Sequence, residues 1–199
     1  MPDYKAIYDA VIAREENYNR PENSPGFLNC QQAYRELSSV SGRALDLGCG
    51  VGFVVELLTD PAYWLEPWGA DISEVAVERA RERVGKKKVP ASRIALLRDQ
   101  NLPFEDSFFS LVTCFDMMEH LDEGDVRQTM REIQRVLRRG GLLFASVSCR
   151  PSGYSDQFGD NLHRTIRGLD WWVSEVDPDR AEYDKHRNQF IMWKTCRKS

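Results

Sequence analysis

Three glycines at alternate positions follow an apolar segment, in the stretch Ala44-Leu45-Asp46-Leu47-Gly48-Cys49-Gly50-Val51-Gly52. Glycine lets the backbone turn sharply and come close to a ligand. In open α/β sheets, ligands bind beyond the carboxyl ends of the strands. The pattern therefore predicts a strand that ends in a loop forming the floor of a cofactor site.

The spacing of these glycines differs from the dinucleotide fingerprint G-x-G-x-x-G. Gly52 comes one residue early, and Phe53 stands where the third glycine would be. Asp46, two residues before the first glycine, would repel a pyrophosphate but could hold an ammonium group. These departures disfavour a nicotinamide-dependent oxidoreductase.

Two further acidic side chains lie at or just past the ends of predicted strands. Asp71 lies about 20 residues beyond the last glycine, where an acidic residue takes ribose hydroxyls in nucleoside-binding α/β folds. Asp99, in the segment 98–104, could accept a hydrogen bond from an adenine amino group, although an ordinary polar turn would explain the same residues. Together with the glycines, these carboxylates predict a nucleoside site.

A second group of residues could act on an acceptor. Asp116, Glu119 and His120 form the pattern D-x-x-E-H after a predicted strand, and His163 lies in a polar stretch further on. An imidazole can take a proton from a hydroxyl or amine group, so His163 and His120 are the candidate catalytic residues. His120 could instead be a structural residue at the start of a helix. The four side chains could also hold a divalent ion.

Alternating strands and helices must position these residues. Hydrophobic periodicity and turn residues predict strands over 43–47, 68–72, 94–97, 109–115 and 142–148, and helices over 53–58, 74–84 and 125–139. Ser73 is a suitable N-cap for the second of these helices. Alternation of this kind predicts a doubly wound α/β fold, with a mostly parallel sheet and helices on both faces.

The two flanks of this core have a different pattern. Residues 1–42 predict a helical N-terminal cap, with apolar stripes over 4–12 and 30–37 separated by a loop over 15–26. Residues 149–199 predict a substrate loop over 149–167, a helix over 169–176 and an antiparallel strand pair over 183–187 and 189–195. In that helix the neighbours Trp171 and Trp172 face different directions, so at least one should pack in the core.

Composition bounds the class of protein. The 199 residues carry a net charge of −4 and are 42% hydrophobic, which is typical of a folded domain and disfavours a broad basic face for nucleic acid. Five cysteines without a C-x-x-C pair predict a reducing compartment. We expect a cytoplasmic protein without membrane segments, organised as a single domain over 1–199 with its cofactor-binding core at 43–148.

The motifs, taken in order, resemble the class I S-adenosylmethionine-dependent methyltransferases. The matching segments are 45–52, 69–73, 99–104, 111–121 and 136–143, so the resemblance covers residues 43–148. It implies a Rossmann-like, seven-stranded sheet with a reversed terminal strand, and S-adenosylmethionine as cofactor. Ser110 departs from the family, in which many members have Asp, and we expect a structural consequence rather than a lost cofactor.

The resemblance also implies roles in the methionyl half of the site. Gly48 and Gly50 would pack beneath the methionyl part of the cofactor, and Asp46 would lie near its amino group. Phe115, at the end of a strand, would lie close to the sulfonium.

A further four residues are implied for the nucleoside half. Asp71 would bind the ribose hydroxyls, and Ile72 would cover one face of the adenine. Asp99 and Gln100 would meet the adenine edge.

The resemblance predicts transfer of a methyl group to an oxygen or nitrogen of a small molecule. Segment 161–172 resembles methyltransferases of natural-product, nodulation-factor and polysaccharide pathways. The D-x-x-E-H pattern with His163 is similar to the metal site of small-RNA 2′-O-methyltransferases and some quinone-precursor O-methyltransferases, which is one alternative function. In those metal-dependent enzymes the first residue of the pattern is Glu rather than Asp, and the same pattern is widespread among family members without metal. We therefore expect no bound metal. The other alternative is a non-catalytic regulatory protein that binds S-adenosylmethionine.

Overall fold

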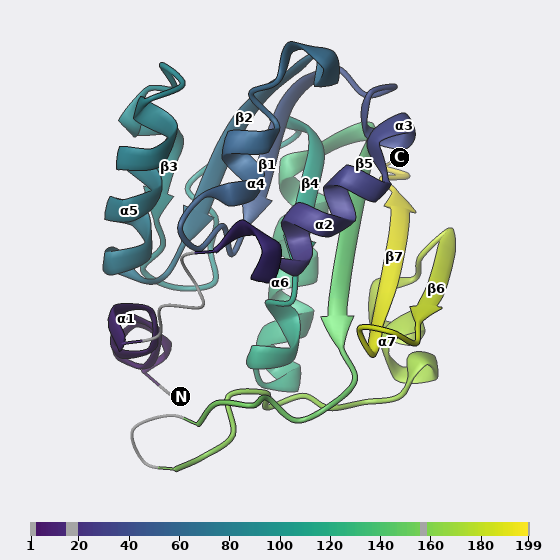
Figure 1. Cartoon of the computed structure of the whole chain (residues 1–199). Helices are drawn as coiled ribbons and strands as arrows, with labels where there is room; N and C mark the ends of the chain where they lie inside the picture. The colour runs from purple at the N-terminus through teal and green to yellow at the C-terminus, as the bar shows by residue number, and fades with distance from the viewer. Residues whose placement is uncertain (1–2, 15–19, 156–158, 199) are drawn as a thin grey trace. The chain divides into compact units, whose positions relative to one another are not determined.

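The computed structural model describes residues 3–14, 20–155 and 159–198 (Figure 1). The seven strands follow the order β3-β2-β1-β4-β5-β7-β6 in the sheet, which confirms the predicted mostly parallel α/β fold. The chain forms two compact units, Met1–Asp99 and Gln100–Ser199. Their boundary falls within the predicted 43–148 core, and the single domain stays a prediction.

The first unit contains three parallel strands and the helices that follow them. Its strands are β1 (Gly42–Leu47), β2 (Leu65–Asp71) and β3 (Ile94–Leu96). Its helices are α1 (Tyr4–Arg14), α2 (Pro25–Gln32), α3 (Tyr34–Leu37), α4 (Phe53–Leu57) and α5 (Glu74–Gly85), with short 3₁₀ turns η2 (Pro21–Asn23), η3 (Pro61–Tyr63) and η4 (Ala91–Arg93). β1 pairs with β2, and β2 with β3, in parallel register.

The N-terminal cap differs from its prediction in two respects. The helical stripe over 30–37 is divided at Ala33, and α2 begins at Pro25, inside the segment predicted as loop. The Ser24 side chain accepts a hydrogen bond from the Phe27 N–H, and a proline suits the first helical position. Cys30, Ala33 and Leu37 of the stripe are buried, whereas Tyr34 is 42% exposed.

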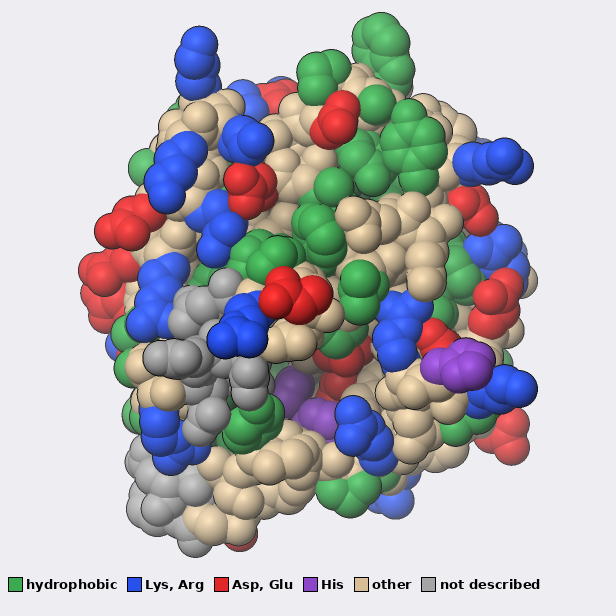
Figure 2. All heavy atoms as spheres, in the orientation of Figure 1, with side chains coloured by type: hydrophobic (Ala, Val, Ile, Leu, Met, Phe, Trp, Pro, Cys, Tyr) green, Lys and Arg blue, Asp and Glu red, His purple; other side chains and the backbone are tan. Residues whose placement is uncertain are grey.

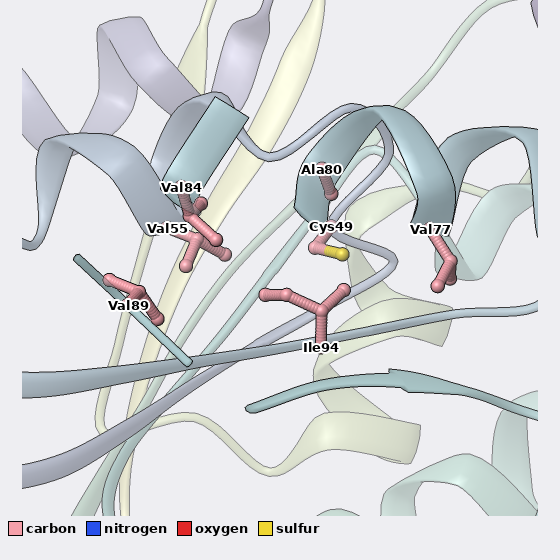
Figure 3. Close-up of a cluster of buried hydrophobic side chains, with 7 residues drawn as sticks. All are labelled: Cys49, Val55, Val77, Ala80, Val84, Val89 and Ile94. Carbon is pink, nitrogen blue, oxygen red and sulfur yellow. The ribbon is translucent and has the colours of Figure 1, made fainter. Parts of the chain in front are cut away.

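A cluster of apolar side chains holds the first unit together (Figure 3). Cys49, from the glycine loop, lies in this cluster with Val55 of α4, three residues of α5, Val89 and Ile94. A Cβ added at Gly69 of β2 would meet the Cys49 sulfur at 2.9 Å and Val55 at 3.0 Å. The absence of a side chain at Gly69 therefore lets the loop and α4 pack against β2.

The second unit contains the other four strands. Its elements are β4 (Phe109–Phe115), the 3₁₀ turn η5 (Met118–His120), α6 (Glu123–Val136), β5 (Leu137–Ser148), α7 (Leu169–Val176), β6 (Arg180–Asp184) and β7 (Gln189–Thr195). β4 and β5 are parallel, whereas β7 is antiparallel to both β5 and β6. The reversed strand implied by the resemblance is thus confirmed.

The prediction that the helix over 125–139 continues to Arg139 is wrong. The helix ends at Val136, and Leu137 begins β5 with extended backbone, φ −70° and ψ 135°. Leu137 pairs with Phe109 in the sheet, and an irregularity in register follows between Phe109 and Leu111. Leu137 fits the apolar stripe of the helix by spacing, but the sheet buries it, so periodicity alone misplaces the boundary.

The first strand of the C-terminal pair begins and ends three residues earlier than predicted. Asp184 accepts hydrogen bonds from the N–H groups of His186 and Arg187, which closes a turn after β6. His186 therefore lies exposed in this turn rather than in a strand. In α7, Trp172 is fully buried and Trp171 is partly exposed, as the sequence predicts for at least one of the pair.

Two properties of the surface bear on partners. Among the described residues, no helix combines the length and the apolar composition needed to cross a bilayer. On the face shown in Figure 2, Lys and Arg side chains are interspersed with Asp and Glu side chains. This face presents no broad basic surface.

Candidate active site

The glycine loop follows β1 and is attached to the end of β2. The N–H groups of Gly48 and Cys49 both donate to the carbonyl oxygen of Ala70, at 2.8 and 3.0 Å. Cys49 points into the apolar cluster of Figure 3. Asp46, 3% exposed, is the penultimate residue of β1. The loop is therefore held by its backbone and by the one side chain between its first two glycines.

Gly50 lies beside open space in this loop, which we call the cradle. Its φ is +50°, a left-handed conformation, and a Cβ built there meets no described atom within 4 Å. Its N–H donates to Oδ2 of Asp71 at 2.8 Å. The loop thus leaves free space beside Gly50 where a ligand can approach the backbone closely. That this space takes the methionyl part of S-adenosylmethionine remains a prediction.

Asp71 closes the loop from the end of β2. It is 9% exposed, and its Oδ1 accepts from the Ser73 N–H at 2.9 Å. Burial raises the pKa of this carboxyl group, while the N–H groups of Ser73 and Gly50 oppose the rise. Each carboxylate oxygen has a second lone pair, so Asp71 can still accept from ribose hydroxyls. Ile72, the next residue, is partly exposed.

Asp9 of α1 is a residue of this region that the sequence analysis did not identify. Its Oδ1 accepts from the Ser73 hydroxyl at 2.7 Å and from the Val75 N–H at 3.2 Å. Burial raises the pKa of Asp9, but hydrogen bonds from Lys5 and Ser73 outweigh it and lower the value. Asp9 thus attaches α1 to Ser73 at the start of α5, and Ser73 is two positions after Asp71 in the sequence. No local pattern marks it, because polar residues on a helix face are common.

The remaining predicted cofactor residues follow β3 and β4. Asp99 is exposed and ends the first unit, whereas Gln100 is partly exposed and begins the second. Phe115, 8% exposed, ends β4, and its ring meets Phe144 edge-on with centroids 4.9 Å apart. Their roles toward a nucleoside and a sulfonium remain predictions.

Glu119 lies buried in the second unit, in η5. It is 0% exposed, and its Oε1 accepts from the Ser148 N–H at 2.8 Å. Its Oε2 has no hydrogen-bond partner within the described part of the chain. Burial, and next the charge of Asp116, raise the pKa of Glu119 well above its usual value. Glu119 is a carboxyl group with one oxygen left unsatisfied.

His120 and His163 lie against each other beside Glu119. Their ring centroids are 4.7 Å apart and their planes nearly perpendicular, and Figure 2 shows two histidine side chains side by side. Nδ1 of His120 is 3.1 Å from the Leu162 carbonyl oxygen, and Nδ1 of His163 is 2.6 Å from that of Arg150. Carbonyl oxygens only accept, so Nδ1 of His163 carries the proton. The His120 ring faces two carbonyl oxygens, those of Leu162 and Asp116.

Both imidazoles are neutral at physiological pH. Burial, and next His163, lower the pKa of His120 to about 3, and burial lowers the pKa of His163. A neutral imidazole has one N–H, so Nε2 of His163 carries a lone pair. His163 therefore presents a basic nitrogen beside His120 and Glu119.

The segment carrying His163 is fixed against η5. The N–H groups of Arg164 and Thr165 donate to the Glu119 carbonyl at 2.8 and 2.9 Å. The Thr165 hydroxyl donates to the Leu121 carbonyl at 2.7 Å. The sequence predicts only a long polar loop here, whereas the structure holds His163 in position with hydrogen bonds on either side.

Asp116, the first residue of the D-x-x-E-H pattern, is oriented differently from the other three. Its φ is +45°, which is unusual for a residue with a side chain. Its Oδ1 accepts from the Ser146 hydroxyl at 2.6 Å. The donor atoms that lie within 4.8 Å of one another belong to Glu119, His120 and His163. The structure therefore brings together three of the four residues.

Comparison with known proteins identifies the family to which the chain belongs. A family model described as "Methyltransferase domain" matches residues 45–145. Methyltransferase GfsG from Streptomyces halstedii is 36% identical over 121 residues, which are 57% of this chain and 40% of that protein. A probable S-adenosylmethionine-dependent methyltransferase from Mycolicibacterium smegmatis is 31% identical over 138 residues, 68% of this chain and 48% of its own. The chain spans about half the length of these relatives.

A solved structure supports the fold over the whole chain. The PH0226 protein from Pyrococcus horikoshii OT3 has a TM-score of 0.72 at 21% identity, with 100% of both chains covered. The chain belongs to the methyltransferase-domain family, within the class I S-adenosylmethionine-dependent methyltransferases. The cofactor of this class is S-adenosylmethionine.

Proposed function

We propose that the protein transfers a methyl group from S-adenosylmethionine to an oxygen or nitrogen of a small molecule. The observation that carries the donor half is the open cradle at Gly50, closed by the buried carboxylate of Asp71. The acceptor half is supported by the neutral imidazoles of His120 and His163. When bound, the cofactor supplies a methyl group on a positively charged sulfur.

In this proposal, the first unit holds the methionyl and ribose parts. Gly48 and Gly50 leave room for the methionyl chain, and the buried Asp46 attracts its ammonium group. Asp71 accepts from the ribose hydroxyls while its loop contacts persist.

The adenine and the sulfonium complete the proposed cofactor contacts. Ile72, which follows β2, covers one face of the adenine. Asp99 and Gln100, which follow β3, meet its edge. Phe115 provides an apolar neighbour for the sulfonium and excludes water there. Each of these contacts helps to position the methyl group and places no second positive charge near the sulfonium.

On the acceptor side, the histidines assist loss of a proton. A hydroxyl or ammonium group becomes a nucleophile when a nearby group favours its deprotonation. His163 offers an unprotonated nitrogen at neutral pH, with the neutral His120 beside it, because burial lowers both pKa values. A small-molecule acceptor is consistent with the net charge of −4, which gives no general attraction to nucleic acid.

Calorimetry with S-adenosylhomocysteine, followed by a screen of acceptors for methyl transfer, tests this function. We expect saturable binding of one equivalent, and His163→Ala should lower turnover without changing the affinity for S-adenosylhomocysteine. Absence of binding would refute the proposal. Binding without transfer to any class of acceptor would instead favour a non-catalytic protein that binds the cofactor.

A further inference from the structure

The first turn of α5 is held by a carboxylate from a different helix. Asp9 of α1 accepts hydrogen bonds at Oδ1 from the Ser73 hydroxyl at 2.7 Å and from the Val75 N–H at 3.2 Å. The Ser73 hydroxyl oxygen in turn accepts from the Ala76 N–H at 3.1 Å. A serine N-cap needs only this last bond, and a hydroxyl proton otherwise rotates freely. Asp9 therefore fixes the Ser73 side chain more firmly than capping requires.

Ser73 also holds the carboxylate that we assign to the ribose. Its N–H donates to Oδ1 of Asp71 at 2.9 Å, and Oδ2 of Asp71 accepts from the Gly50 N–H at 2.8 Å. Two donors on different oxygens fix the rotation of this carboxylate. Ser73 is 0% exposed, so water cannot readily replace its contacts. A series of hydrogen bonds, which we call the Asp9 network, thus joins Asp9, Ser73, Asp71 and Gly50.

Packing and a backbone hydrogen bond hold α1 where Asp9 can reach Ser73. Ile12, one turn after Asp9, lies in a cluster of buried side chains with Val51 of the glycine loop and Ala76 of α5. The Ile12 carbonyl oxygen accepts from the Arg79 guanidinium at 2.9 Å. In Figure 1, α1 lies beside the end of α5 at which that helix begins. The position of Asp9 is therefore set by contacts on the following turn of its own helix.

We propose that Asp9 is a positioning residue of the cofactor site, which acts on the ribose through Ser73 and Asp71. The inference deepens the proposed function and rests on its assignment of Asp71. A carboxylate can accept about four hydrogen bonds, so Asp71 can still accept from the ribose hydroxyls while it is held by the network. The rotation of the Asp71 carboxylate decides where those hydroxyls must lie. Asp9 controls that rotation without contacting the ribose.

The role of Asp9 comes from its oxygen rather than from its charge. Burial, and least of all the charge of Asp9, raise the pKa of Asp71, so the two carboxylates repel. The Lys5 ammonium lies 2.7 Å from Oδ2 of Asp9 and 3.2 Å from Glu74, and it offsets part of that repulsion. A neutral side chain that keeps an acceptor oxygen at the same place should therefore serve as well as aspartate.

Calorimetry with S-adenosylhomocysteine on variants of the full chain tests the role. Asp9→Ala removes the acceptor oxygen, and the affinity should fall about fivefold, the effect of losing one hydrogen bond. Asp9→Asn keeps Oδ1 and should bind as tightly as wild type. Asp60→Ala is the matched control, because Asp60 also caps a helix, accepting from the Ala62 N–H at the start of η3. It precedes β2, whereas Asp71 ends β2, so its loss should leave the affinity unchanged.

A double-mutant cycle separates positioning from general destabilisation. Asp9→Ala should weaken binding about fivefold in the otherwise wild-type chain but no more than about twofold in the Asp71→Asn chain, because the carboxylate that it orients is already lost. A merely structural role predicts equal losses in both. Circular dichroism checks that each variant folds. Asp9→Leu, which has a similar volume and a higher helix propensity, takes the place of Asp9→Ala if the latter does not fold.

The Asp9 network also predicts a change in the protein without ligand. Hydrogen exchange at the Gly50 N–H, followed by nuclear magnetic resonance, should be faster in Asp9→Ala than in wild type, because Asp71 is then held less firmly. Amides of β4 report global unfolding and should change less than Gly50. Equal changes at Gly50 and in β4 would show that Asp9 acts only on overall stability.

The inference and the proposed function fail in different ways. The inference alone is overturned if Asp9→Ala binds S-adenosylhomocysteine as tightly as wild type, if Asp60→Ala loses affinity equally, or if Asp9→Asn binds no better than Asp9→Ala. It is also overturned if the losses caused by Asp9→Ala and Asp71→Asn add. If the wild type binds no S-adenosylhomocysteine, the proposed function fails, and exchange at Gly50 decides whether Asp9 positions Asp71.

Discussion

Replacing Gly50 by alanine separates cofactor binding from folding. Gly50 has φ +50°, and an added Cβ meets no described atom within 4 Å. The substitution therefore introduces backbone strain but no clash within the protein. A residue with a side chain in the left-handed region costs about 1–2 kcal/mol, which lowers the melting temperature by roughly 2–8 °C in a chain of this size.

The same methyl group would occupy the space assigned to the methionyl part of the cofactor. We therefore expect the affinity for S-adenosylhomocysteine to fall at least tenfold, or about 1.4 kcal/mol. Gly140→Ala is the matched control. Gly140 has φ +73°, and a Cβ there also meets nothing within 4 Å, but it lies at the exposed start of β5. The control should lose similar stability and keep wild-type affinity.

The assay is calorimetry with S-adenosylhomocysteine, with melting curves of both variants measured in the same buffer. Wild-type affinity in Gly50→Ala would refute the assignment of the space beside Gly50 to the cofactor. Equal losses of affinity in both variants would show that general destabilisation, rather than the filled space, controls binding.

Three further predictions follow from buried groups. The pKa of His120 is about 3 in the folded protein against an ordinary value of 6.5 for histidine, so the free energy of unfolding should fall by up to roughly 5 kcal/mol as the pH falls from 6.5 toward 3. In urea unfolding across this range, the free energy of unfolding of His120→Asn should depend less on pH than that of the wild type. Equal pH dependence in the two proteins would contradict the assignment. Trp172→Ala, at a 0% exposed side chain, should cost about 3–5 kcal/mol of unfolding free energy, and Trp171→Ala markedly less; equal losses in urea unfolding would contradict the burial. Asp71→Asn should weaken S-adenosylhomocysteine binding by roughly 1.5–3 kcal/mol, and an unchanged dissociation constant in calorimetry would remove Asp71 from its role.

Hydrophobic periodicity is enough to predict the bounds of an element when the residues that its pattern marks as apolar are the ones that are buried. The strand Phe109–Phe115 and the helix Leu169–Val176 occupy the predicted ranges. Ser73 is the N-cap of α5 because its short hydroxyl side chain reaches the Ala76 N–H. Leu137 is different, since its apolar character fits either a helix stripe or a buried strand. Its pairing with Phe109, distant in sequence, decides for the strand.

The candidate site shows the same division. The glycine spacing and the acid ending the second strand are local features, so Gly50 and Asp71 could be identified from the sequence, and their mutual hydrogen bond agrees with that choice. Asp9 could not be identified, because its contact with Ser73 joins residues 64 positions apart. No sequence signal distinguishes its side chain from other polar residues of a surface helix.

The amino-acid sequence by itself determined the alternation of strands and helices, the glycine loop and the residue types that could bind a cofactor or take a proton. Those properties depend on residues near one another in the chain, through side-chain periodicity and backbone freedom. Only the tertiary structure decided that one oxygen of Glu119 has no hydrogen-bond partner among the described residues, that His120 and His163 touch, and that Asp116 turns toward Ser146. Burial and hydrogen-bond partners arise from segments that meet only when the chain is folded, so no local pattern contains them.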